Sequence, residues 1–132
     1  MYINKIRKDG TDYDITNGET YSTEEQIIGT WIDGKSLYRK TIVYTSGWTI
    51  GGETILEHGI ADLAEVVSYK AKYLRSDNTT QFIPTIHADM QNWASGMYDF
   101  STTGFVIYIG ALSNTYTINK LIITLEYTKT TN

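Results

Sequence analysis

The sequence predicts an all-β protein, a single domain built as an antiparallel, jelly-roll-like β-sandwich with at most short helical turns. Three observations support this prediction. Segments of alternating apolar and polar residues recur along the chain, turn signals rich in Gly, Asp and Asn separate them, and no helical apolar pattern outlasts one turn. Because each such strand buries one face, the strands are expected to pack as two sheets around one core.

The length and composition fit one domain. The chain has 132 residues, of which 41% are hydrophobic and 20% are charged, and these proportions are ordinary for a globular protein. We predict that the sandwich occupies residues 19–132. Residues 1–18, with an Asp9-Gly10 turn signal in the middle, are expected to be either a connector or an edge hairpin of the same domain.

The most strongly patterned stretch runs from Tyr21 to Tyr44. Ser22 and Glu25 have the spacing of a capping box, which predicts one helical turn. The β-prone run around Trp31 then stops at Asp33-Gly34, which favours a two-residue type I′ turn. Residues 36–44 are therefore expected to return antiparallel, with Trp31 in the middle of the first strand, where a core or interface position explains it.

The rest of the chain continues as short strands. Pro84 has no amide proton to donate, so its strand is expected at a sheet edge or at a bulge. The predicted elements are a strand at 53–59, a helical turn at 60–64, strands at 65–75 and 81–86, a pair at 97–101 and 105–110, and a half-buried strand at 121–128.

Three sequence strings resemble a known family. The string YSTEEQIIGTWIDGKSLYRK at residues 21–40, HGI at 58–60 and EYTK at 126–129 are similar to a module found near the C-terminus of tail-fibre, baseplate and minor structural proteins. Those proteins belong to tailed phages and prophages of Firmicutes. The resemblance implies a virion tail protein, made in the host cytoplasm, that acts in assembly or in attachment to the host surface.

The resemblance also implies partners. Tail fibres and their tips are usually homotrimers, so a homotrimer in contact with other virion tail proteins is expected, with a host cell-surface glycan as a further partner. Tyrosines on the strand faces, such as Tyr38, Tyr44 and Tyr108, would then lie at subunit interfaces. The 11 tyrosines of the chain suit half-buried strands, interfaces and carbohydrate-binding surfaces alike.

Composition excludes several classes of protein. The net charge of −4 gives no electrostatic reason for nucleic-acid binding. The chain has no cysteine, which excludes disulfides and thiolate metal sites. No segment has the roughly 20 apolar residues that span a bilayer, so membrane insertion is not expected. Residues 1–10 lack the apolar core of a signal peptide.

No catalytic, metal or cofactor site is predicted. Glu24 and Glu25 are adjacent, so they are poorly placed to approach a glycosidic bond from opposite sides. His58 lies in a turn-like HGI string, where a ring nitrogen is expected to satisfy backbone carbonyls. The sequence around Ser46-Gly47 does not match a nucleophile elbow. A glycan-cleaving tail tip remains the alternative from the enzyme class.

Two loops have the composition of a carbohydrate site. Sugars present apolar C–H faces and hydroxyl edges, so their sites combine aromatic rings with Asp, Asn or Gln side chains. Loops also carry binding residues more often than strands do. The candidate ligand-binding residues are Asp89, Gln91, Asn92, Trp93, Tyr98 and Asp99 in one loop region and Trp48 in another.

Overall fold

The structure is a computed structural model that describes residues 5–8, 10–15, 20–84, 94–111 and 116–131. The described residues form strands and turns and contain no helix, which confirms the all-β prediction. The strands are β1 (Lys5–Lys8), β2 (Thr11–Ile15), β3 (Gln26–Thr30), β4 (Ser36–Tyr44), β5 (Gly52–Glu57), β6 (Leu63–Arg75), β7 (Thr80–Ile83), β8 (Ser95–Tyr98), β9 (Gly104–Ile109) and β10 (Ile118–Lys129).

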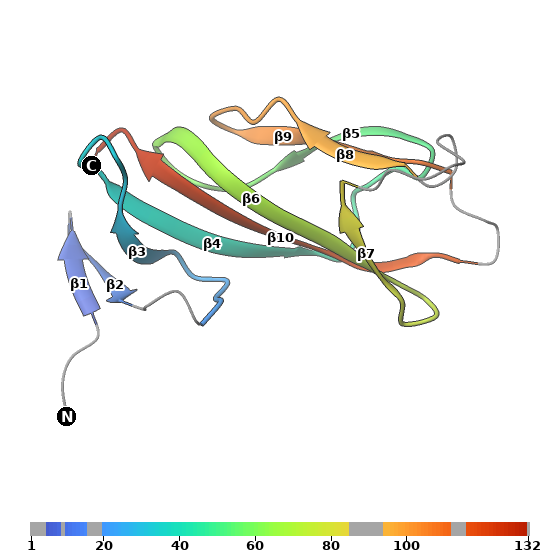
Figure 1. The fold of residues 1–132 in the computed structure, drawn as a ribbon, viewed down its shortest axis with the longest axis horizontal. Coiled ribbons are helices and arrows are strands. Elements are labelled where there is room, and N and C mark those ends of the chain that lie inside the picture. The colour runs from blue at the N-terminus through green and yellow to red at the C-terminus, as the bar shows by residue number, and fades with distance from the viewer. Residues whose placement is uncertain (1–4, 9, 16–19, 85–93, 112–115, 132) are drawn as a thin grey trace. The chain divides into compact units, whose positions relative to one another are not determined.

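The strands form two sheets (Figure 1), and these confirm the antiparallel β-sandwich. The larger sheet has the order β1-β2-β3-β4-β10-β6-β7, and the smaller one has the order β5-β9-β8. One pair departs from the antiparallel rule, since β2 runs parallel to β3 with Asp14 opposite Gln26. The β1–β2 hairpin thus lies at one edge of the larger sheet. The predicted domain boundary at residues 18–19 falls outside the described residues.

The chain forms two compact units. Unit 1 comprises Met1–Ile42, Ala61–Tyr69 and Thr124–Asn132, and unit 2 comprises Val43–Ile60 and Lys70–Ile123. The long strands β4, β6 and β10 contribute residues to both units. Each unit has its own buried side chains, so the two are described separately.

Unit 2 contains the layered part of the sandwich. Tyr44 at the end of β4 and Phe105 on β9 meet edge to face, with ring centroids 6.2 Å apart. The Tyr44 hydroxyl also donates a hydrogen bond of 2.6 Å to the carbonyl of Glu57 on β5. Side chains from both sheets are buried in this unit: Leu56, Ala71, Tyr73, Ile83, Met97, Phe105, Ile107, Ile109, Leu121 and Ile123.

The ionisation of Tyr44 makes stability depend on pH. Burial, with a contribution from the charge of Glu57, raises the pKa of Tyr44 from 10.0 to about 12. The folded chain therefore keeps this proton at a pH where the unfolded chain has lost it. Because the protonated form is favoured in the folded state, this contribution to stability is complete below about pH 10 and is lost as the pH rises toward 12.

We expect Tyr44→Phe to flatten this alkaline decline. The variant loses the hydrogen bond to Glu57, which costs about 1 kcal/mol at neutral pH, and it has no proton to lose. Urea denaturation at about pH 8 and about pH 11 measures both effects. A fall in stability between the two pH values as steep as that of the wild type would contradict this role. Some decline remains in the variant because burial also raises the pKa of Tyr73.

The β3–β4 turn corrects the predicted turn type. β3 ends at Thr30, which pairs with Ser36 at the start of β4. Trp31 begins the turn, because its carbonyl accepts a 2.9 Å hydrogen bond from the Gly34 amide and its amide donates to the Lys35 carbonyl at 2.8 Å. Within this turn, Gly34 is the residue that adopts a positive φ, +87°, and Asp33 does not. The connection is therefore a three-residue loop with a bulge rather than a type I′ turn, and half-buried Trp31 lies outside the strand.

Within unit 1, Arg39 on β4 makes polar contacts with β3 and with the segment that precedes it. Buried Arg39 donates through Nε to Gln26 Oε1 at 3.4 Å and through its guanidinium to the Thr20 carbonyl. The same guanidinium lies 4.2 Å from the centroid of the Tyr21 ring. Gln26 also donates to the Thr20 carbonyl at 3.0 Å. These contacts hold the segment before β3 against β4.

The predicted capping box is wrong. Ser22 Oγ accepts a 3.0 Å hydrogen bond from the Glu24 amide in a bend without a helical turn. The Glu25 carboxylate instead reaches β10, where it accepts from Lys129 Nζ at 2.7 Å and from the Tyr127 hydroxyl. Tyr127 in turn stacks on Tyr38, with centroids 5.8 Å apart. A long-range ion pair has therefore replaced the local cap.

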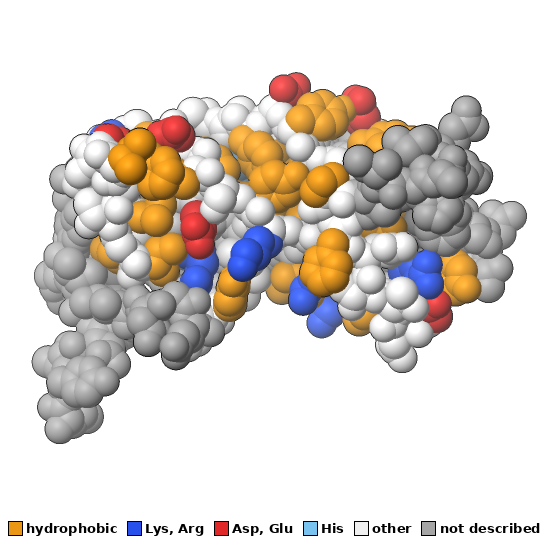
Figure 2. All heavy atoms as spheres, viewed as in Figure 1, with side chains coloured by type: hydrophobic (Ala, Val, Ile, Leu, Met, Phe, Trp, Pro, Cys, Tyr) orange, Lys and Arg blue, Asp and Glu red, His pale blue; other side chains and the backbone are white. Residues whose placement is uncertain are grey.

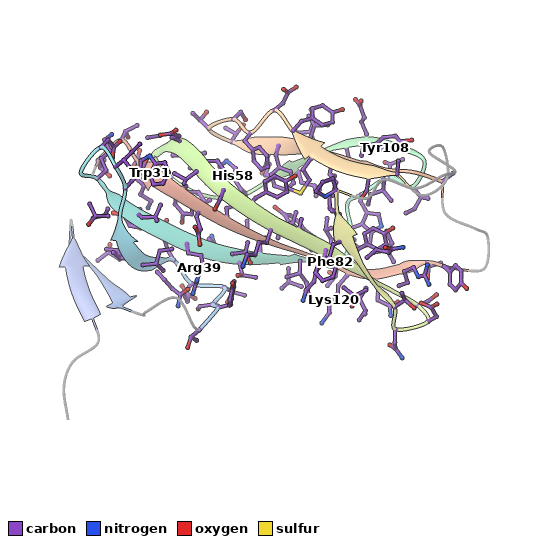
Figure 3. The ribbon with its side chains drawn as sticks, in the orientation of Figure 1. Trp31, Arg39, His58, Phe82, Tyr108 and Lys120 are labelled. Atoms are coloured by element: carbon purple, nitrogen blue, oxygen red, sulfur yellow. The ribbon has the colours of Figure 1, made fainter. Side chains whose placement is uncertain are left out.

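His58 stabilises a turn in unit 2 (Figure 3), which confirms its predicted structural role. Its Nδ1 accepts a 3.0 Å hydrogen bond from the Ile60 amide. Nε2 therefore carries the proton and donates to the Ser101 carbonyl at 2.9 Å. The helical turn predicted nearby is wrong, because residues 61–62 form a simple turn in which Asp62 has a φ of 58°.

Two further predictions are confirmed. β7 is an edge strand of the larger sheet, as predicted, but it ends at Ile83, so Pro84 follows the strand instead of lying inside it. The predicted pair around residues 97–110 is present as β8 and β9, with Met97 opposite Ile107. β8 and β9 are two of the three strands of the smaller sheet.

Candidate functional site

The smaller sheet presents one exposed face, which we call the tyrosine face. It consists of Glu53, Ile55, Gly96, Tyr98, Val106 and Tyr108. Along each strand, side chains alternate between the two faces of a sheet. Leu56, Met97, Phe105, Ile107 and Ile109 point into unit 2 and are buried, so their neighbours in the strands point outward.

Strand register arranges the tyrosine face in two rows. Val106 on β9 lies between Ile55 on β5 and Tyr98 on β8. Tyr108 lies between Glu53 on β5 and Gly96 on β8. Ile55 is 76% exposed and Tyr98 is 38% exposed, while Val106 and Tyr108 are half-buried. Apolar and aromatic surface thus runs across all three strands.

Gly96 leaves room beside Tyr108. A Cβ added at Gly96 would meet no atom within 4 Å, so the described residues leave the space next to the Tyr108 side chain open. Figure 3 labels Tyr108 on this sheet. A tyrosine next to an open position in a strand offers part of its ring for stacking on a flat ligand.

A hydrogen bond crosses the tyrosine face diagonally. The Tyr98 hydroxyl donates to the carboxylate of Glu53, over the strand that lies between them. This bond, with smaller effects of burial and of the charges of Glu53 and Asp99, raises the pKa of Tyr98 to about 12. The shift delays the ionisation of Tyr98 to strongly alkaline pH, since a tyrosine of ordinary pKa is already neutral at physiological pH.

The tyrosine face lies in an acidic environment. The sequence carries no Lys or Arg from Val43 to Ile60 or from Ser76 to Asn119, the ranges that include all three strands. Glu53 and Glu57 are both exposed on β5. Figure 2 shows Asp and Glu side chains beside hydrophobic ones over this sheet, and both acidic and basic side chains over the larger sheet.

The structure places only some of the residues that the sequence predicted for ligand binding. Asp89, Gln91, Asn92 and Trp93 lie outside the described residues. Tyr98 lies on the tyrosine face, and exposed Asp99 follows it with a φ of 54°.

Trp48 is half-buried in the loop between β4 and β5, which has glycines of positive φ at positions 47 and 51. The roles of Trp48 and of the other predicted residues in binding stay predictions.

Sequence reasoning missed Glu53, Ile55 and Tyr108 as parts of a site. Residues 105–110 carry apolar or aromatic side chains at both alternating positions, which predicts a strand covered on both faces. The described residues place no second layer over this face. The available signal was the alternation in GETILE together with the long intervals free of Lys and Arg. Tyr38 was expected at a subunit interface, but it is 1% exposed and packs on Tyr127 of its own chain.

No protein-family model, curated protein or solved structure matches this chain. Among the described residues, no group of three or more His, Asp or Glu side chains is placed to hold a metal ion. The same part of the chain contains no helix of the length and apolarity needed to cross a membrane.

The two glutamates of β5 lie far apart along the strand. Glu53 and Glu57 lie four residues apart on one strand, so their Cα atoms are separated by about 13 Å. Glycosidase carboxylates face each other across a bond at about 5–9.5 Å. The Glu53 carboxylate is also engaged by Tyr98.

Proposed function

We propose that this chain is a non-catalytic attachment module that binds a cell-surface glycan on the tyrosine face. The observation that carries the proposal is the pair of outward-facing tyrosines, Tyr98 and Tyr108, on neighbouring strands beside the Glu53 carboxylate. Tyrosine rings match the apolar C–H faces of sugars, and carboxylates accept hydrogen bonds from sugar hydroxyls. An open sheet face suits an extended polysaccharide better than a small, enclosed ligand.

The resemblance to phage tail modules supplies the context of the proposal. In that context the module belongs to a virion tail fibre or baseplate, assembles as a homotrimer and contacts other tail proteins. The residues that carry the resemblance, such as Tyr21, Glu25, Arg39 and Lys129, contact one another within unit 1. They build the scaffold, and specificity therefore belongs to other surfaces.

A purely structural role in virion assembly is the second candidate. It is favoured by the side chains of the 21–40 string, which serve packing and hydrogen bonding inside the chain. This candidate predicts a trimer by light scattering and no binding of any glycan. Release of reducing sugar from cell-wall polysaccharide would overturn both non-catalytic proposals.

Binding to cell-wall glycans of Gram-positive bacteria tests the attachment role. We expect Tyr108→Ala and Tyr98→Ala each to weaken binding about tenfold, because each removes a stacking surface at the centre of the contact. Phe82→Ala is the matched control, since Phe82 is 67% exposed but lies on the other sheet of the same unit. Glycan arrays and titration calorimetry measure the effect.

The same experiment separates the tyrosine face from the loops. If Tyr98→Ala and Tyr108→Ala bind as well as the wild type while Trp93→Ala or Trp48→Ala loses binding, the site lies in the loops. Loss of binding in Phe82→Ala would place the site on the larger sheet. Circular dichroism of each variant checks that the fold is intact.

A further inference from the structure

Charge is segregated within unit 2. Its lysines, Lys70, Lys72 and Lys120, lie on β6 and β10 of the larger sheet. The strands of the smaller sheet carry Glu53 and Glu57 and no cation. A ligand at the tyrosine face therefore meets negative charge that is not neutralised by Lys or Arg on the same sheet (Figure 2).

The negative charge lies close to the aromatic surface. Glu53 is directly opposite Tyr108 and is hydrogen-bonded to Tyr98. Exposed Asp99 follows Tyr98 in the chain, and the negative charges of Glu53 and Asp99 contribute to the raised pKa of Tyr98. A bound sugar on either tyrosine thus lies next to a carboxylate.

Two interactions at such a surface favour a cationic ligand. An ammonium group is attracted to the face of a tyrosine ring, and it pairs with a carboxylate through charge-assisted hydrogen bonds. A carboxylate or phosphate on the ligand meets like charge, which disfavours binding. A neutral sugar experiences neither the attraction of an ammonium group nor the repulsion of an anion.

We propose that the tyrosine face selects glycans that carry free amino groups, such as polymers of non-acetylated amino sugars, and rejects polyanionic glycans. This inference rests on the proposed function, since it names the ligand class for the same face. Glu53 is the residue that sets the preference, because it lies in the row of Tyr108 and contacts Tyr98. Glu57 strengthens the preference from the end of the same strand.

Three oligosaccharides of equal length test the inference: oligomers of glucosamine, of N-acetylglucosamine and of galacturonic acid. We expect glucosamine oligomers to bind about tenfold more tightly than the N-acetylated ones at low salt. The galacturonic acid oligomers are expected not to bind. The advantage of glucosamine should shrink as salt is raised, because mobile ions screen exposed charges.

Charge variants locate the effect. Glu53→Gln keeps an oxygen that can accept the Tyr98 hydrogen bond but removes the charge, so it should abolish most of the glucosamine preference. Glu65→Gln is the matched control, because Glu65 is exposed on β6 in unit 1 and the change in net charge is identical. An equal loss in both variants would mean attraction by overall charge and would overturn the inference.

Failure of the inference is distinguishable from failure of the proposed function. If Tyr108→Ala weakens binding but the acetylated and free oligomers bind equally, the glycan site stands and its selectivity for amines is wrong. If no oligomer or wall glycan responds to Tyr108→Ala, the proposed function itself is wrong. Tight binding of the galacturonic acid oligomers that depends on Tyr108 would also overturn the inference.

Discussion

Gly104→Ala is expected to lower the free energy of unfolding by about 3 kcal/mol, a large effect for a single methyl group. A Cβ at this position would lie 2.3 Å from the Leu56 carbonyl oxygen and 3.2 Å from its carbonyl carbon. Both atoms belong to the backbone of β5, which pairs with β9 along its full length. Because no side-chain rotation relieves this overlap, the two strands must separate.

Gly96→Ala is the matched control. Gly96 also lies in the smaller sheet, but its added Cβ would meet no atom within 4 Å. Alanine in a strand restricts the unfolded chain more than glycine does, so the control is expected to be neutral or to gain up to about 1 kcal/mol. Urea denaturation measures both variants. Equal stabilities would show that β5 and β9 are not as closely packed as described.

Glu25→Ala is expected to cost about 3 kcal/mol. The side chains of Lys129 and Glu25 are only 11% and 19% exposed, and their charged atoms lie 2.7 Å apart. Removing the carboxylate takes the counter-ion from the Lys129 ammonium and removes a hydrogen-bond acceptor of the Tyr127 hydroxyl. The cost comes from these partners, which stay largely shielded from water.

Two further variants test that explanation. Glu24→Ala alters an exposed neighbour and is expected to change stability by less than about 0.5 kcal/mol. The double change Glu25→Leu with Lys129→Met removes both charges and should recover most of the loss, because apolar pairs often replace buried ion pairs without penalty. A double variant less stable than Glu25→Ala would show that the shape of the pair, and not its charge, is what matters.

Regular alternation allowed much of the fold to be predicted from the sequence. β10 was predicted most clearly, because apolar and polar residues alternate along it. In the structure its apolar residues Leu121, Ile123, Leu125 and Tyr127 have no exposed surface. The edge position predicted for the strand near Pro84 is also confirmed, although Pro84 directly follows β7 and its missing amide proton lies outside the strand. Such features are local, and local rules describe them well.

Long-range contacts explain what the sequence did not predict. The spacing of Ser22 and Glu25 satisfies the local rule for a cap, yet Glu25 pairs with a lysine 104 positions away. In the hairpin, the Asp33-Gly34 signal located the turn, but the hydrogen bonds of Trp31 with Gly34 and Lys35 make the loop one residue longer than predicted. Tertiary contacts outweighed local preference in both cases.

The candidate site was harder to predict because it depends on how the strands are paired. Glu53, Tyr98 and Tyr108 are distant in sequence and become neighbours only through the register of β5, β8 and β9. A loop rich in polar and aromatic residues can be recognised in the sequence. A row of side chains on the outer face of a sheet can be recognised only when the strand register is known. The alternation in GETILE and the long intervals free of Lys and Arg were the only local signals of this face.

The place of β10 between β4 and β6 also determines how the chain can fold. Thr41 and Thr124 hydrogen-bond at 2.8 Å across 83 positions, and Ser68 and Glu126 at 3.0 Å across 58. The middle of the larger sheet therefore closes only after long loops have formed, which makes folding slow. Until β10 has been synthesised, β4 and β6 lack the strand that lies between them in the folded sheet. Their unpaired edges can then pair with other chains.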